Sequence, residues 1–176
     1  MATLGKTTLG LSNFSIGANW ASAYTITVPA FDIEVQSLVH YFNSGTAING
    51  KGVIWDSSNN IVSISNALSI GSSAVWYTHV WTTNPILTAS TSYKIGVVVS
   101  AGRQTRYTST GGAAVGFDSG NNYTTPETLA LDWTNFQPSV YINYIEAPAS
   151  GPAILIEGIT PAEVNTVEWA NITSIK

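Results

Sequence analysis

Residues 52–64 are Gly52-Val-Ile-Trp-Asp-Ser-Ser-Asn-Asn-Ile-Val-Ser-Ile64, and they give the clearest indication of the fold class. Two short runs rich in β-branched residues flank Ser57-Ser-Asn-Asn60, whose side chains are typical of a tight turn. The stretch therefore predicts a β-hairpin. The same alternation recurs along the chain, and helix signals are nearly absent before residue 158.

Further strands are expected wherever apolar and polar residues alternate between Gly, Asn, Ser and Pro. They are Tyr24–Val28, Ile33–Phe42, Ala74–Thr82, Tyr93–Val99, Gly102–Thr108 and Ser139–Ile145. Both faces of Ala74–Thr82 are substantially apolar, so this strand is expected at the centre of a sheet. About eight strands so spaced predict an all-β fold, a two-sheet antiparallel β-sandwich of which the jelly roll is the simplest form.

Composition narrows the function classes. Of 176 residues only 9% are charged, whereas 20 Ser, 21 Thr and 14 Asn supply a neutral polar surface. A hydrophobic fraction of 44% excludes a disordered chain. The few cations are scattered, which argues against nucleic acid as a partner. Apolar runs are too short for membrane insertion, and we expect no secretory signal at the N-terminus.

The organisation along the chain changes at Ala147. Residues 1–146 are the expected sandwich domain, 147–152 a linker rich in Pro, Gly and Ser, and 153–176 a tail for oligomerisation or docking. In the tail, apolar residues recur at alternating spacings of three and five, and such a short repeat cannot bury its own apolar stripe. The expected docking residues are Ile156, Ile159, Val164, Val167, Trp169, Ile172 and Ile175.

The sequence predicts no catalytic residues, no metal ligands and no cofactor. With no cysteine, His40 and His79 are too few for a zinc site, and we interpret them as strand residues with satisfied hydrogen bonds. Asp32 and Glu34 could form a glycosidase pair, but solvated turn residues are the favoured interpretation. Asp118-Ser-Gly-Asn-Asn122 is better interpreted as an Asx turn than as a calcium loop.

Aromatic residues are the strongest remaining signal. They suit either the core and subunit contacts or an exposed sugar-stacking platform, and the first alternative is favoured. Two arginines beside Tyr107 could add a contact with an acidic neighbour. The candidate glycan or subunit contacts are Trp76, Trp81, Trp133, Tyr123, Arg103 and Arg106.

Several motifs resemble a jelly-roll module of tailed-bacteriophage virion proteins. They are Thr3-Leu-Gly5, Thr8-Leu-Gly10, Val35-Gln-Ser-Leu38, Gly52-Val-Ile-Trp-Asp-Ser-Ser57 and Leu87-Thr-Ala-Ser-Thr-Ser-Tyr93. The tail is similar to a short repeat of phage structural proteins in its pairs Val164-Asn-Thr-Val167 and Ile172-Thr-Ser-Ile175, although it lacks their usual Asn-Gly.

The resemblance implies a non-enzymatic virion protein of the capsid-decoration, head-fibre or tail receptor-binding type. Its expected location is the virion, and its expected partners are other capsid or tail subunits. We expect a homo-oligomer, with a trimer as the working assumption. The alternative is a carbohydrate-binding adhesion module that recognises host surface glycans through exposed Trp and Tyr.

Overall fold

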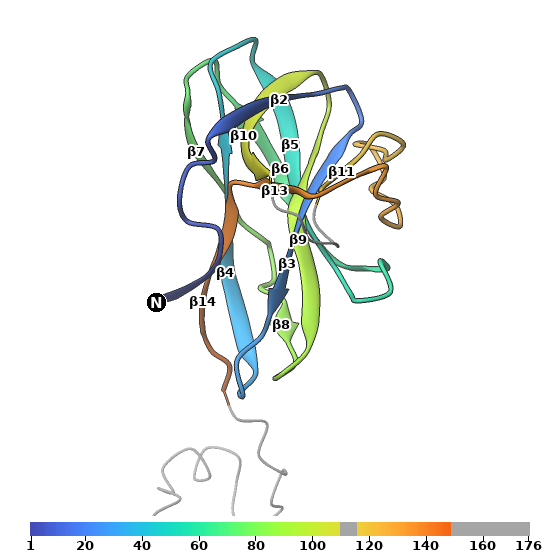
Figure 1. Ribbon diagram of the computed structural model, residues 1–176. Helices are drawn as coiled ribbons and strands as arrows, with labels where there is room; N and C mark the ends of the chain where they lie inside the picture. The colour runs from blue at the N-terminus through green and yellow to red at the C-terminus, as the bar shows by residue number, and fades with distance from the viewer. Residues whose placement is uncertain (110–115, 149–176) are drawn as a thin grey trace, which may run out of the picture.

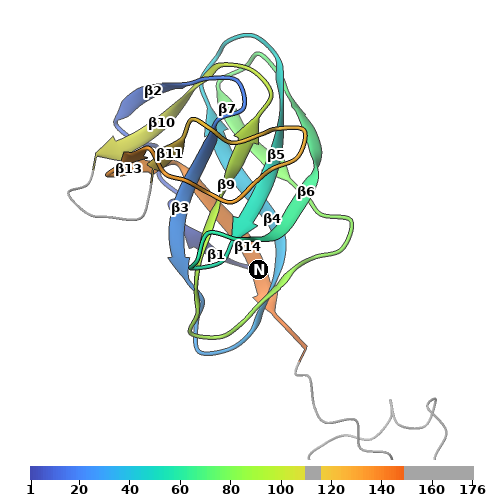
Figure 2. The ribbon, with the colours of Figure 1, turned by 90° about the vertical axis from the view of Figure 1, so that its right-hand side faces the viewer.

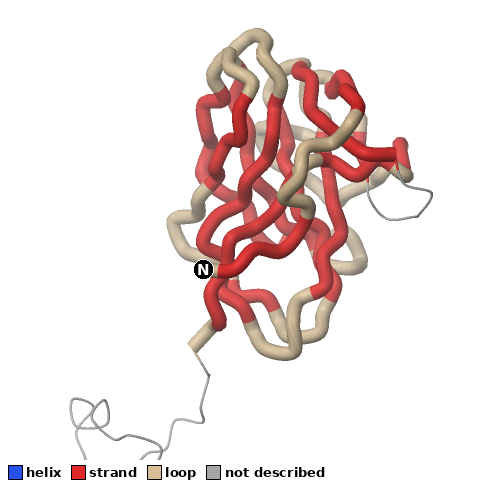
Figure 3. Tube along the Cα trace, turned by 60° about the vertical axis from the view of Figure 1, so that its left-hand side comes forward, coloured by secondary structure: helices blue, strands red, loops and turns tan. Residues whose placement is uncertain are grey.

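A computed structural model of the chain describes residues 1–109 and 116–148, and its regular elements there are all β-strands (Figure 3). The strands are β1 (Ala2–Gly5), β2 (Ser12–Ile16), β3 (Ala21–Thr27), β4 (Ile33–Phe42), β5 (Ile48–Trp55), β6 (Ile61–Ile70), β7 (Val75–His79), β8 (Ile86–Leu87), β9 (Ser92–Val99), β10 (Arg103–Ser109), β11 (Gly116–Asp118), β12 (Trp133–Thr134), β13 (Phe136–Pro138) and β14 (Val140–Glu146).

These strands form two antiparallel sheets that pack face to face (Figure 1). Sheet A has the order β1-β14-β4-β10-β13, with β2 paired to β10 and with β7 and β8 paired to β4. Sheet B has the order β12-β11-β3-β9-β5-β6. The chain crosses repeatedly between the two sheets, as it does in a jelly roll. The predicted all-β, two-sheet antiparallel sandwich is confirmed.

The predicted hairpin forms from β5 and β6. Asn59 takes a positive φ of 71°, and the Asp56 carboxylate accepts the backbone N–H of Asn60 at 2.9 Å. Asn and Asp tolerate this conformation and bond to nearby backbone, which explains the turn. Two register shifts in the β5–β6 pairing interrupt the edge strand β6, a feature that discourages edge-to-edge association.

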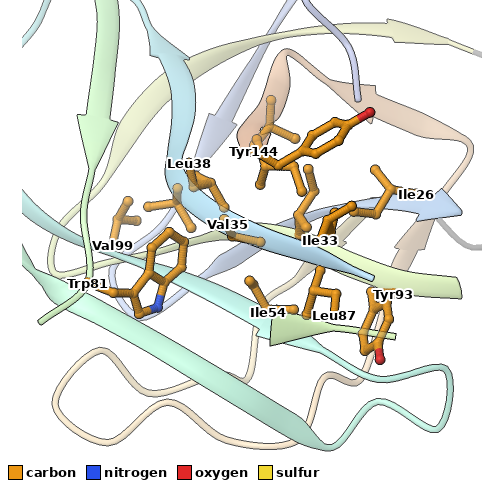
Figure 4. Packing of buried hydrophobic residues seen from close by; sticks show 14 of the residues in the cluster. Ile26, Ile33, Val35, Leu38, Ile54, Trp81, Leu87, Tyr93, Val99 and Tyr144 are labelled. Carbon is orange, nitrogen blue, oxygen red and sulfur yellow. The ribbon is translucent and has the colours of Figure 1, made fainter. Parts of the chain in front are cut away.

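The main core lies between the two sheets (Figure 4). It is built from inward-facing aliphatic and aromatic residues of both sheets, among them Ile33, Leu38, Phe42, Ile54 and Ile95. Strand β9 lies between β3 and β5, and Tyr93–Val99 is buried throughout. The nearly continuous apolar run in the sequence therefore marks a strand covered on both faces, as predicted.

A second apolar cluster lies on the outer face of sheet B. It comprises Ala21, Ala23, Val53, Trp55, Val98 and Leu129. Residues 119–132 cross in front of β3, β9 and β5 (Figure 2), and the Trp55 Nε1–H donates to the Glu127 carbonyl at 3.0 Å. Asp118 anchors this segment by accepting the N–H groups of Gly120 at 2.8 Å and Ala130 at 2.9 Å. Its carboxylate thus acts within the turn, in agreement with the Asx interpretation.

The position predicted for Ala74–Thr82 is wrong. The strand formed there, β7, is shorter, and among the described strands it pairs with β4 alone, so it does not lie at the centre of a sheet. Its inward residues Tyr77 and His79 face the core, while Trp76 faces outward. The outward face of β7 is apolar because Trp76 contacts other aromatic rings on the surface of sheet A. From the sequence alone, such a strand looks the same as a central strand that is buried on both faces.

Candidate functional site

The outer faces of the two sheets differ in how they are covered. The outer face of sheet B carries the second apolar cluster, which residues 119–132 cover. On sheet A, by contrast, neither apolar cluster of the described residues lies on the outer face of β14, β4 and β7. This uncovered face instead presents half-buried aromatic side chains. It is therefore the candidate functional site of the described part of the chain.

Three rings form what we call the aromatic trio, Tyr41, Trp76 and Tyr141. Trp76 lies directly opposite Tyr41 in the β4–β7 pairing, with ring centroids 5.5 Å apart and planes at 72°. Its centroid is 5.3 Å from that of Tyr141 on β14, at 63°. Val39 points to the same face between these strands but is only 4% exposed. The rings therefore cover Val39 and form a packed aromatic surface.

A neutral polar rim, Thr3, Ser37, Thr78 and Asn143, borders the aromatic trio. Thr3, Asn143 and Ser37 are aligned across β1, β14 and β4, and the Asn143 amide donates to Ser37 Oγ at 2.8 Å. Thr78 lies opposite Val39 on β7. Neither the trio nor this rim contains a charged side chain, so a partner can cover it without desolvating an ion.

Gly5 keeps the β1 side of the trio open. It lies opposite Tyr141 with a positive φ of 119°, where residues with a side chain are strained. A Cβ added at Gly5 would lie 2.8 Å from the Val140 carbonyl oxygen and 3.2 Å from Tyr141 Cβ. The β1 backbone can therefore approach the Tyr141 backbone and Cβ closely only because this residue is glycine.

The geometry of the trio favours one kind of contact. Planes inclined at 63° and 72° do not form the coplanar platform that an extended sugar chain requires. Interlocked aromatic rings within a neutral hydrogen-bonding rim are, however, the composition of protein interface centres, where Trp and Tyr supply much of the binding energy. The site can provide an apolar anchor with neutral donors and acceptors around it.

Of the six candidate contacts, only Trp76 belongs to the trio. Trp81 is 7% exposed and lies in the core near Val35, Ile54 and Val99 (Figure 4). Its assignment to a surface contact is corrected, because its large apolar ring fills space between the sheets. Tyr123 is half-buried on the sheet B side, where Lys51 Nζ lies 5.0 Å from its ring centroid. Trp133 occupies β12, at the edge of sheet B.

Arg103 is also corrected from a surface contact to a structural residue. It is 5% exposed, and its guanidinium donates to the carbonyls of Asn43 and Thr46 at 2.8 Å, of Gly71 at 2.6 Å and of Ser73 at 3.1 Å. It thereby joins two loops at one end of the sandwich. Arg106 is half-buried and donates to Asn13 Oδ1 at 2.8 Å. The two arginines therefore have different environments on the same strand.

Tyr41 and Tyr141 were not identified from the sequence. Each lies within a strand that the sequence predicts, but which strands become neighbours is set by the pairing of β4 with β7 and β14. Ring contacts across three strands depend on that pairing. The docking residues predicted in the tail, Ile156 to Ile175, lie outside the described residues.

The two histidines are buried between the sheets. His40 Nε2 lies 2.9 Å from Ser22 Oγ, whereas neither ring nitrogen of His79 has a hydrogen-bond partner among the described residues. The expectation of satisfied bonds is therefore wrong for His79. Burial lowers the pKa of His40 to about 3, with repulsion from His79 as a smaller cause. Burial likewise lowers the pKa of His79 to about 4, so both rings are neutral at pH 7.

The carboxylates near the start of β4 have structural partners. Asp32 Oδ1 accepts the Ala89 N–H at 2.8 Å, and Glu34 Oε1 accepts the side-chain amides of Asn84 at 2.9 Å and Gln36 at 3.0 Å. These amides, Asn84 first, lower the pKa of Glu34. A general acid needs a raised pKa, so the environment of Glu34 argues against an acid–base pair, although Glu34 lies in strand β4 and not in the predicted turn.

Residues 1–109 and 116–148 contain neither a metal-binding cluster nor a membrane-spanning helix. Histidine and carboxylate side chains there do not gather in groups of three or more that could hold a metal ion. The same residues contain no helix long and apolar enough to cross a membrane.

Comparison with known proteins shows a distant likeness to a viral protein of known structure. No protein-family model matches the chain, and no curated protein matches it. Among solved structures, the chain is similar to a mutant VP2 protein of infectious bursal disease virus from derived T=1 particles, with 12% identity and a TM-score of 0.30. The match covers 93% of this chain but 45% of that one, so this chain spans less than half its length.

Proposed function

We propose that this chain is a non-enzymatic structural protein of a virus particle. In this proposal it decorates or projects from a bacteriophage capsid and contacts neighbouring subunits through the outer face of sheet A. The supporting observation is the aromatic trio on an uncovered sheet face with an uncharged rim. The phage assignment comes from the sequence motifs, and the contact surface comes from the geometry.

The physical basis of the proposal is the low cost of covering this face. Burial of aromatic area is favourable at roughly 25 cal/mol per Å², and the trio and rim contain no ion to desolvate. Half-buried rings held by one another also lose little conformational freedom on binding. The face is therefore suited to repeated contacts in a close-packed assembly.

The test is replacement of Trp76 by serine in the full chain. We expect Trp76→Ser to weaken self-association, or binding to particles that lack this protein, by at least tenfold, measured by sedimentation. Tyr123→Ser on the other sheet is the matched control and should have little effect. Unchanged association of a correctly folded Trp76→Ser protein would contradict the proposal.

A second candidate is the adhesion module, in which Trp76 stacks on a sugar of a host glycan. Its favouring observation is the position of the indole on an open face beside neutral hydroxyl and amide groups. Titration of tryptophan fluorescence with bacterial polysaccharides tests it. A shift present in the native chain but lost in Trp76→Ser would favour this candidate over a subunit contact.

A further inference from the structure

A second exposed apolar region lies at the end of the sandwich where β14 terminates. We call it the apolar foot and define it by Met1, Phe31, Ile86 and Ile145, which are 84%, 39%, 59% and 41% exposed. In sheet A, Ile145 is aligned with Glu34, which in turn is aligned with Ile86 on β8. Two of the four residues therefore flank a single carboxylate on one face.

The other two residues of the foot border an open pocket. Its volume is about 340 Å³, and its lining includes Met1, Phe31, Ile145 and Glu146. The pocket lies beside the N-terminal strand, because β1 pairs with β14 through Ala2 and Tyr144. The foot thus combines exposed apolar side chains with a concave surface large enough for one or two aliphatic side chains.

The chain itself leaves the sandwich at this foot. The Ala147 N–H donates to the Asp32 carbonyl at 2.9 Å, next to Phe31, and the described residues end at Pro148. The sequence beyond contains the aliphatic repeat of residues 153–176. We infer that this tail docks on the apolar foot of its own chain, with its isoleucines and valines covering Met1, Phe31, Ile86 and Ile145.

Chain length favours docking within one chain. The six residues 147–152 span up to roughly 20 Å when extended, enough to return the start of the tail to the foot. A short flexible connection gives an effective concentration on the order of millimolar. A weak apolar contact within one chain therefore forms at protein concentrations that are too low for contact with a second copy. The inference goes beyond the proposed function and does not depend on the aromatic trio.

Glutamates on both the foot and the tail should make docking of the tail depend on the salt concentration. Glu34 and Glu146 lie at the foot, and the tail contains Glu157, Glu163 and Glu168. These like charges oppose docking, and salt screens them. Docking driven by apolar burial should therefore become stronger as the salt concentration rises.

The test uses the absence of cysteine from the native chain. In the full chain, Ile86→Cys is combined with Ile159→Cys, and the rate of disulfide formation is followed on a non-reducing gel. The control is Val75→Cys with Ile159→Cys. Val75 is 43% exposed and aligned with Phe42, whereas the foot lies near Ile33, roughly 30 Å away along β4.

We expect the foot pair to form an intrachain disulfide at least tenfold faster than the control pair, and faster still in 0.5 M NaCl. Adding Ile156→Ser should slow the foot pair, whereas adding Thr166→Ser should not. Equal rates for foot and control, or a predominantly interchain product, would overturn the inference. Because Trp76→Ser is expected to leave these rates unchanged, failure of docking and failure of the proposed function are distinguishable.

Discussion

At the scale of single residues, the two buried histidines are the least expected feature. His40 Nε2 contacts Ser22 Oγ, and His79 has no hydrogen-bond partner among the described residues. Gly50 and Gly52 make room for the His79 ring, because an added Cβ would lie 3.3 Å from its Cε1 or 3.1 Å from its Cβ. Both imidazoles are therefore held neutral by burial.

This burial predicts a loss of stability in mild acid. In the folded state the two pKa values lie at about 3 and about 4, below the ordinary 6.5 expected on unfolding. As the pH falls below 6.5, the unfolded chain binds up to two protons that the folded chain does not. The free energy of unfolding should fall by up to about 1.4 kcal/mol per pH unit per proton, levelling off below the folded pKa values.

Urea unfolding between pH 7.5 and 4.5 measures this slope. His79→Leu removes one titrating ring together with its two unpaired nitrogens, so we expect it to reduce the slope to about half and to preserve stability at pH 7. A slope unchanged by His79→Leu would show that other groups cause the acid sensitivity.

At the scale of elements, Arg103 connects the loop after β4 with the turn between β6 and β7. Its five hydrogen bonds end on the carbonyls of Asn43, Thr46, Gly71 and Ser73. Both loops also meet directly, since the Gly45 N–H donates to the Ser72 carbonyl at 3.0 Å. A planar guanidinium fork suits several converging carbonyls in a way that a single ammonium does not.

Arg103→Lys is therefore expected to be strongly destabilising although it keeps the charge. It should lower the free energy of unfolding by about 2–4 kcal/mol, because buried carbonyls lose their donors. Thermal unfolding measures the loss, and hydrogen exchange at the Gly45 amide should become faster. Arg106→Lys, the same change on the same strand, should alter stability by no more than about 0.5 kcal/mol. Equal effects of the two variants would contradict this role for Arg103.

The strands differ in how well the sequence predicts them. Ile33–Phe42 and the hairpin of residues 52–64 were predicted closely, because their alternation and turn chemistry are local. Strands β1, β2, β8 and β11 to β13 were missed as separate elements. They are short or polar, and they exist because a neighbouring strand supplies their hydrogen bonds.

At the scale of the whole molecule, one outer face of the sandwich is covered, whereas the described residues leave the other face uncovered over β14, β4 and β7. The covered face of sheet B is closed by the segment after Asp118, and the outer face of sheet A carries the aromatic trio. A contact between subunits through that uncharged face would involve few interactions between charged side chains. Its strength should therefore depend only weakly on ionic strength.

Sedimentation of the full chain at 0.05 M and 0.5 M NaCl tests this expectation. We expect the association constant to change by less than about threefold, with a slight increase because salt screens the net charge of −4 on each copy. A tenfold weakening at high salt would instead indicate a contact made by charged residues outside the trio.

The amino-acid sequence is enough to establish the all-β class, because alternating β-branched residues and Asx-type turns act over a few residues. It also determined the neutral, poorly charged surface, which is a matter of composition. Which aromatic residues are buried depends on how the strands pack: Trp76 and Trp81 lie five positions apart, yet one faces outward and the other fills the core. The difference depends on strand pairing and sheet packing, which bring together residues that are distant along the chain.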